Sequence, residues 1–189
     1  MKIQEVTNAP KKIDILSVMS YICHWERWPE LETGISNLIS TVPKYRYNGD
    51  MYRGLSLPLN TFNKHTDIRL VLTNLQKFEM ENGDNSMSWS KSLNGMYIAL
   101  TNNMDSNENV YGPCFYVIKQ HTVGLDTFPI VQDYPQYDID KVAVLLGDEQ
   151  EVLAKIDNSV HLHGFILDDK FYTAEQFQTF VNQIKQKNS

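Results

Sequence analysis

The feature that most constrains this fold is the order of two sequence patterns: segments with a helical spacing of apolar residues come first, and segments typical of strands follow. Across residues 12–25 and 31–42, apolar side chains recur every three or four positions, as on one face of an amphipathic helix. Most later segments are rich in aromatic and β-branched residues, and Thr173 with Gln176 forms a capping box that opens a last helix. A parallel α/β fold would alternate strands and helices throughout. The order therefore predicts an α+β fold with antiparallel strands.

The same spacing predicts the individual segments. Strands are predicted over residues 45–57, 86–92, 114–120, 141–147, 151–156 and 160–167. Shorter helices are predicted over 67–78 and 93–100, and loops over 102–109 and 126–137. If the run SMSWSKS at 86–92 is a strand, its four serines point to one face.

The length favours a single domain. A chain of 189 residues can bury one sizeable core and is short for two ordinary domains. No repeat or internal boundary interrupts it. We expect a helical N-terminal part over 1–44, a catalytic β core over 45–168 and a C-terminal helix over 173–187.

Composition disfavours several classes of partner. The net charge of -6 makes nucleic acid an unlikely partner without excluding it, because a broad basic surface is missing. The N-terminal residues lack the apolar run of a secretory signal, and no stretch is apolar enough to span a membrane. Cys23 and Cys114 stand far apart with no CxxC, which is typical of a reducing compartment. A cytoplasmic protein without a membrane segment is expected.

Familiar cofactor and metal motifs are missing. Neither GxGxxG nor GxxxxGK[ST] occurs, so the sequence predicts neither a Rossmann nor a P-loop site. His161 and His163 could place two imidazoles on one strand face, but no third ligand stands at a recognisable spacing. We therefore expect no metal site, and two histidines on a solvated strand face.

Three short strings carry the chemistry. Arg53 stands in YRGL, Ser88 and Ser90 in SWS, and Glu149 and Glu151 in EQEVL, in that order. Glu-x-Glu occurs twice more, at 30/32 and 79/81, but only the last pair follows both other strings and enters a predicted strand. Side chains two apart in a strand point to the same side, so this pair is expected to act together.

In these strings the sequence resembles the mono-ADP-ribosyltransferases, which carry an Arg, a Ser-x-Ser and a Glu in that order, with Glu-x-Glu in the arginine-specific branch. It is most similar to the small phage-encoded group, which also has an acidic residue before the pair and a Val after it, as in 148–152. The resemblance covers residues 52–156 through short motifs. It implies two packed, mostly antiparallel sheets, NAD as the substrate, and no metal. It also implies an arginine of a host protein as the acceptor.

The resemblance implies that Arg53, Gly54, Ser88 and Ser90 contact or support NAD. A guanidinium fork suits the pyrophosphate, since it can donate two charge-assisted hydrogen bonds to phosphate oxygens. Gly54 lacks a Cβ, so its backbone can approach a flat amide such as nicotinamide. The Ser88 hydroxyl is expected to orient the catalytic carboxylate, and Ser90 to support the strand.

The two carboxylates are expected to divide the reaction between them. Glu151 would stabilise the positive charge that develops on the ribose as nicotinamide leaves, in the way a carboxylate assists glycoside hydrolysis. Glu149 would hold or deprotonate the acceptor guanidinium, which is otherwise too basic to be a good nucleophile. The segment 126–147 is expected to be a loop beside the acceptor.

Several alternatives stay open at this point. The serine run allows the registers SMS, SWS and SKS, and an aromatic middle residue favours SWS. An aromatic ring is expected to stack on nicotinamide, with Phe115, Tyr116 and Phe128 as candidates. The same site could serve an NAD glycohydrolase, in which water replaces the acceptor. A protein that keeps this fold without turnover is a further possibility.

Overall fold

A computed structural model describes residues 10–56, 68–104, 114–138, 142–167 and 169–187. The helices are α1 (Lys12–His24), α2 (Leu31–Thr41), α4 (Ile68–Asn82), α5 (Leu93–Met104), α6 (Thr127–Asp133), α7 (Ala143–Glu149) and α8 (Ala174–Lys187), with 3₁₀ turns at Pro43–Tyr45 and Pro135–Tyr137. The strands are β1 (Arg46–Ser56), β2 (Met87–Ser90), β3 (Cys114–Asp126), β4 (Glu151–Ala154), β5 (His161–Leu167) and β6 (Lys170–Thr173). The fold is α+β, as predicted.

The strands form one antiparallel sheet in the order β1-β2-β4-β3-β5-β6, and β1 also pairs with β3. The β1–β3 pairing runs from Arg46↔Leu125 to Ser56↔Phe115. On its other edge β3 pairs first with β5 and then, at Leu125 and Asp126, with β4. Because β3 pairs with β1 and β4 as well as with β5, all six strands belong to one sheet. The expectation of two separate sheets is therefore wrong. The strands β1, β2, β4 and β3 thereby close on one another.

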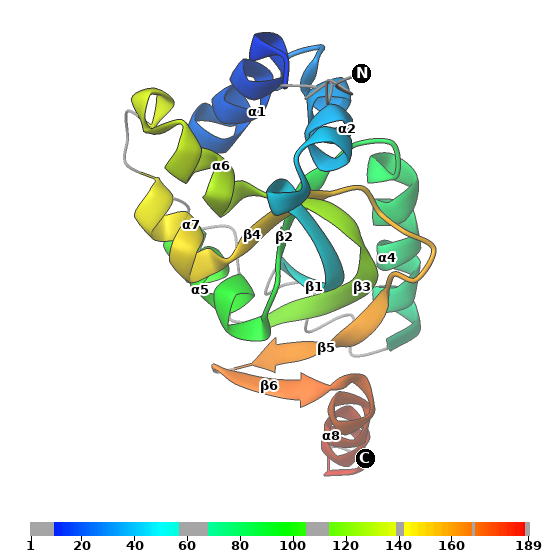
Figure 1. Ribbon diagram of the computed structural model, residues 1–189. Coiled ribbons are helices and arrows are strands. Elements are labelled where there is room, and N and C mark those ends of the chain that lie inside the picture. The colour runs from blue at the N-terminus through cyan, green and yellow to red at the C-terminus, as the bar shows by residue number, and fades with distance from the viewer. Residues whose placement is uncertain (1–9, 57–67, 105–113, 139–141, 168, 188–189) are drawn as a thin grey trace, which may run out of the picture.

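Helices cover this sheet at both ends (Figure 1). The pair α1 and α2 lies at one end beside α6, and α8 lies at the other end with β5 and β6. The first group shares a core that includes Val18, Leu38, Ile130 and Leu153. This packing buries the apolar stripe that predicted the two N-terminal helices.

Two further cores occupy the two faces of the long strands. Met51, Trp89, Ile118 and Phe165 lie in one core, together with residues of α4 and α8. On the opposite face, Met96 of α5 packs against the odd-numbered neighbours Phe115 and Val117 and against Ile166. Side chains of β3 thus alternate between the two cores, as in any strand, and the strand predicted from residue 114 on is confirmed. The capping box is confirmed as well, because Thr173 N–H donates to Gln176 Oε1 at 2.9 Å and Gln176 N–H donates to Thr173 Oγ1 at 3.2 Å.

The segment 126–147 differs from its prediction. Residues 127–133 form α6 where a loop was expected, and the predicted strand at 141–147 is helix α7 within its described part. A short apolar run fits either element, and here only Leu146 is buried, while Val144 is 72% and Leu145 49% exposed. The carboxylate of Asp138 accepts the N–H groups of Val142 at 2.7 Å and Ala143 at 3.3 Å, two donors that the start of the helix leaves without a backbone partner. The described part of this segment is therefore mostly helical.

Two smaller differences complete the comparison. Strand β6 was not predicted, since only four residues form it. Of the predicted loop 102–109, residues 102–104 belong to α5 and 105–109 lie outside the described residues. Within the described part of the chain, no helix is long and apolar enough to cross a membrane.

Candidate active site

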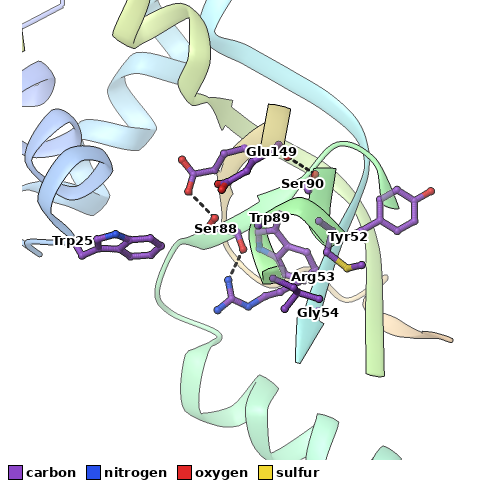
Figure 2. Close-up of a pocket in the computed structure, with 12 residues that line it drawn as sticks. Trp25, Tyr52, Arg53, Gly54, Ser88, Trp89, Ser90 and Glu149 are labelled. Atoms are coloured by element: carbon purple, nitrogen blue, oxygen red, sulfur yellow. Dashed lines mark hydrogen bonds between the residues drawn. The ribbon is translucent and has the colours of Figure 1, made fainter. Parts of the chain in front are cut away.

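The structure brings every predicted site residue to one cavity. Its volume is about 180 Å³, which is below the roughly 300–1,000 Å³ of most small-molecule sites. Of the six predicted residues, β1 supplies two, β2 supplies two, and the junction of α7 with β4 supplies the two acids (Figure 2). In chain order they are Arg53, Gly54, Ser88, Ser90, Glu149 and Glu151.

The contact between Ser88 and Glu151 lies at the centre of the site. Strands β2 and β4 pair with Ser90 opposite Glu151, so Ser88 is the diagonal neighbour of Glu151. Its hydroxyl donates to Glu151 Oε1 at 2.6 Å, across 63 residues of sequence. A hydroxyl bonded in this way fixes the orientation of the carboxylate.

The carboxyl group of Glu151 is buried, and this controls its ionisation. Burial raises the pKa of Glu151 because it disfavours the charged form, while the hydrogen bonds of Ser88 and Thr127 and the charge of Arg53 lower it. Among the described residues, Oε2 of this carboxyl has no hydrogen-bond partner. A buried oxygen without a partner is costly, which makes it a natural place for a ligand to bind.

Glu149 reaches the cavity by a route that differs from its prediction. It is the last residue of α7, not part of a strand, and Gln150 after it takes a left-handed conformation with φ of 54°. The alternation of side chains in a strand therefore does not place the two acids together, and a helix-to-strand turn does so instead. The carboxylate Oε1 of Glu149 accepts from Asn102 Nδ2 of α5 at 2.8 Å.

A close helix approach fixes the position of that turn. A Cβ added to Gly95 of α5 would lie 2.4 Å from the backbone oxygen of Glu149 and 2.5 Å from Ser90 Oγ. The same backbone oxygen accepts the Ser90 hydroxyl at 2.5 Å. Glycine lets α5 pack directly on the junction of α7 with β4, which in turn brings Asn102 to Glu149.

Arg53 lies in the floor of the cavity. One of its terminal nitrogens donates to the backbone oxygen of Ser88, and its Cζ lies 5.9 Å from the ring centre of Phe78. Burial lowers the pKa of Arg53, yet an arginine keeps its charge across the physiological range. Its Nε is buried and has no partner among the described residues. The site thus holds a cation with an unused donor.

The absence of a Cβ at Gly54 makes room for a side chain of α5, whereas it was expected to make room for nicotinamide. A Cβ at Gly54 would lie 2.4 Å from Leu100 Cδ1, so α5 packs a leucine against this stretch of backbone. Leu100 itself lines the cavity. A flat group in the site would meet Leu100 together with the Gly54 backbone.

The serines at positions 86, 88 and 90 lie in two different environments. Ser88 and Ser90 line the cavity, and the Trp89 indole between them is buried in the core, where it donates to the Ala154 backbone oxygen at 3.1 Å. Ser86 lies before the strand, and its hydroxyl donates to Glu32 of α2 at 2.7 Å. Of the three registers, SWS is the one whose first hydroxyl contacts Glu151.

None of the three expected stacking rings lines the cavity. Phe115 and Tyr116 are buried in two different cores, and Phe128 packs beside Gly147 near the N-terminal helices. The aromatic rings at the cavity, besides Trp89, are Trp25 and Tyr52. Sequence reasoning missed Trp25 because it ends an amphipathic helix, far along the chain from every motif.

The two histidines of β5 pack against rings. His163 lies 5.5 Å from Tyr52 and 5.3 Å from Phe171 between ring centres, and His161 lies 6.4 Å from His163. In the described residues, no group of three His, Cys, Asp or Glu side chains is arranged as metal ligands.

Comparisons with known proteins add no identification to this geometry. No protein-family model matches the chain, and searches of curated proteins and of solved structures found no match either.

Proposed function

We propose that this protein is a mono-ADP-ribosyltransferase that transfers ADP-ribose from NAD to an arginine side chain of a protein and releases nicotinamide. The observation that carries the proposal is the hydrogen bond from Ser88 to the buried carboxyl of Glu151, in a cavity that also holds Arg53 and Glu149. These are the residues of the three motifs, although 98 positions separate Arg53 from Glu151.

The unused polar atoms of the cavity fit NAD as a substrate. Arg53 has a buried Nε that no other described residue contacts by a hydrogen bond, and a guanidinium binds phosphate oxygens through charge-assisted hydrogen bonds. Glu151 Oε2 is the matching unpartnered acceptor. The diphosphate of NAD would supply oxygens that accept a hydrogen bond from Arg53 Nε. The ribose beside the cationic nicotinamide ring would supply hydroxyl donors or positive charge to Glu151 Oε2.

Glu151 assists the bond-breaking step in this proposal. The bond between the ribose C1′ and the nicotinamide nitrogen breaks, and its electron pair leaves with nicotinamide, which becomes neutral. Positive charge moves to the sugar, where the ionised carboxylate of Glu151 stabilises it. Ser88 keeps that carboxylate in position through its hydrogen bond of 2.6 Å.

Glu149 acts on the acceptor. A nitrogen of the arginine guanidinium forms the new bond to C1′, and the proton it loses passes to the Glu149 carboxylate and then to water. The hydrogen bond from Asn102 holds that carboxylate at the cavity wall. The products are nicotinamide, a proton and ADP-ribosylated arginine.

The test is incubation of the purified protein with radiolabelled NAD and a bacterial lysate, with nicotinamide release measured in parallel. Glu151→Gln and Glu149→Gln remove one negative charge each and keep the side-chain shape. Asp148→Asn is the matched control, since Asp148 is exposed on α7 next to both and does not line the cavity.

For a transferase, wild type and Asp148→Asn label proteins, Glu151→Gln neither labels proteins nor releases nicotinamide, and Glu149→Gln releases nicotinamide without labelling. Nicotinamide release by wild type without any labelled protein assigns an NAD glycohydrolase. No release and no label from wild type rejects an enzyme of this kind and leaves a binding protein.

A further inference from the structure

Trp25 stands at the cavity in an unusual backbone conformation. It follows α1 with φ of 58°, and its N–H donates to the backbone oxygen of Tyr21 at 2.9 Å. Glycine is the usual residue for a left-handed helix end, because any side chain is strained there. A tryptophan kept in such a place is a reason to look for a role of its ring.

The ring of Trp25 is available to a ligand. The residue is 63% exposed although its side chain is among the largest apolar groups, and it lines the same cavity as Arg53 and Ser88. Its aromatic neighbour is Tyr21, which meets it edge to face with ring centres 5.8 Å apart. That contact leaves ring surface open on the cavity side.

A network of polar contacts fixes the segment that follows Trp25. The Arg27 guanidinium donates to the Ser86 backbone oxygen at 2.5 Å and lies 3.4 Å from Glu32 Oε1. Glu32 in turn accepts the N–H of Ser86 at 2.9 Å and its hydroxyl at 2.7 Å. Since Ser86 directly precedes β2, this network holds the N-terminal helices against the strand that carries Ser88.

In the view of Figure 2, several of the labelled lining residues lie in a row. Figure 2 shows Trp25 on one side of Ser88 and the Arg53 guanidinium, with Gly54 and Tyr52 on the other side. NAD has the same order of parts: a nicotinamide ring at one end, the diphosphate in the middle and an adenine ring at the other end. With the diphosphate at Arg53 and nicotinamide beside Gly54, the adenine end lies toward Trp25.

We propose that Trp25 stacks on the adenine ring of NAD. This inference rests on the proposed function, because the order of NAD along the cavity follows from it. Stacking of a base on an aromatic side chain is sequence-tolerant and strong enough to dominate an exposed site.

The experiment measures binding of three probes by calorimetry: carba-NAD, which cannot release nicotinamide; ADP-ribose, which lacks only nicotinamide; and nicotinamide mononucleotide, which lacks the adenosine and one phosphate. The variants are Trp25→Ala, Trp25→Phe and, as the matched control, Trp28→Ala. Trp28 lies three residues further on, is also partly exposed and does not line the cavity. Equal thermal unfolding of the variants establishes that each is folded.

For stacking, Trp25→Ala weakens carba-NAD and ADP-ribose by about fivefold or more, as expected for the loss of one stacked base. Trp25→Phe recovers most of that loss, and the affinity for nicotinamide mononucleotide stays at the wild-type value. Unchanged ADP-ribose binding in Trp25→Ala overturns the inference while the proposed function stands. A loss confined to nicotinamide mononucleotide assigns the ring to the other end and overturns it too. If wild type does not bind carba-NAD, the proposed function fails first.

Discussion

Removing the Ser88 hydroxyl tests the central contact of the site. Ser88→Ala deletes the hydrogen bond of 2.6 Å to Glu151 Oε1 and leaves the strand intact. A hydrogen bond to a charged group contributes about 1.5–3 kcal/mol. If this bond is made to the carboxylate that stabilises the developing charge, its loss lowers the rate of nicotinamide release by roughly 10- to 150-fold.

The same change also alters the pH dependence of the reaction. The Ser88 hydrogen bond lowers the pKa of Glu151 against the effect of burial, so without it the pKa rises further. Glu151 acts as a carboxylate, and activity is lost as pH falls through its pKa. The acid limb of the rate profile therefore moves to higher pH in Ser88→Ala.

The assay is the initial rate of nicotinamide release from NAD between about pH 5 and pH 9, compared with Ser90→Ala. The Ser90 hydroxyl donates to the Glu149 backbone and not to Glu151, so its loss leaves the acid limb in place. A Ser88→Ala enzyme with the wild-type rate and acid limb would refute the reasoning, since Glu151 would then need no partner.

Three further predictions concern the surroundings of the two acids. Gly95→Ala places a Cβ 2.4 Å from the Glu149 backbone oxygen and is expected to lower the free energy of unfolding by about 1–3 kcal/mol in urea titrations; an unchanged value would contradict the close packing of α5. Asn102→Ala removes the hydrogen-bond donor to Glu149 Oε1. The ratio of arginine labelling to nicotinamide release should then fall, while the unfolding temperature stays the same. An unchanged ratio would argue against a role for that bond. Glu151→Gln should raise the unfolding temperature at pH 8 and not at pH 4. Because the pKa of Glu151 is raised on folding, the native state binds the extra proton between the unfolded and folded pKa values, and wild type loses stability as pH rises through that interval. A gain of equal size at both pH values would rule out that cause.

The predictions from the sequence were most accurate where a spacing or a motif is compatible with a single kind of structure. The apolar stripe of residues 12–25 predicts helix α1 because only a helix buries that spacing, and the structure contains it. The motif order predicts that Ser88 and Glu151 belong to one site, and their strands are neighbours with a direct hydrogen bond between them. Both are local or motif-borne signals.

The rest of the site depends on tertiary contacts that no local pattern encodes. Helix α7 was predicted as a strand because its run of apolar residues is short. Apolar residues such as Val144 and Leu145 are typical of a buried strand, but both are exposed in the structure. Trp25 reaches the cavity through the polar network around Ser86, which joins two distant segments. Spacing along the chain contains no information on such long-range contacts.

The left-handed turn at Gln150 separates the two acids into different structural elements. Glu149 moves with α7, whose surface is largely exposed, and Glu151 is fixed by the buried strand β4. Under the proposed function, evolution can therefore vary the surface of α7 and change which proteins are modified, while the part of the site that splits NAD is inherited unchanged. Acceptor choice and bond cleavage become separately selectable traits, although only one residue lies between the two acids.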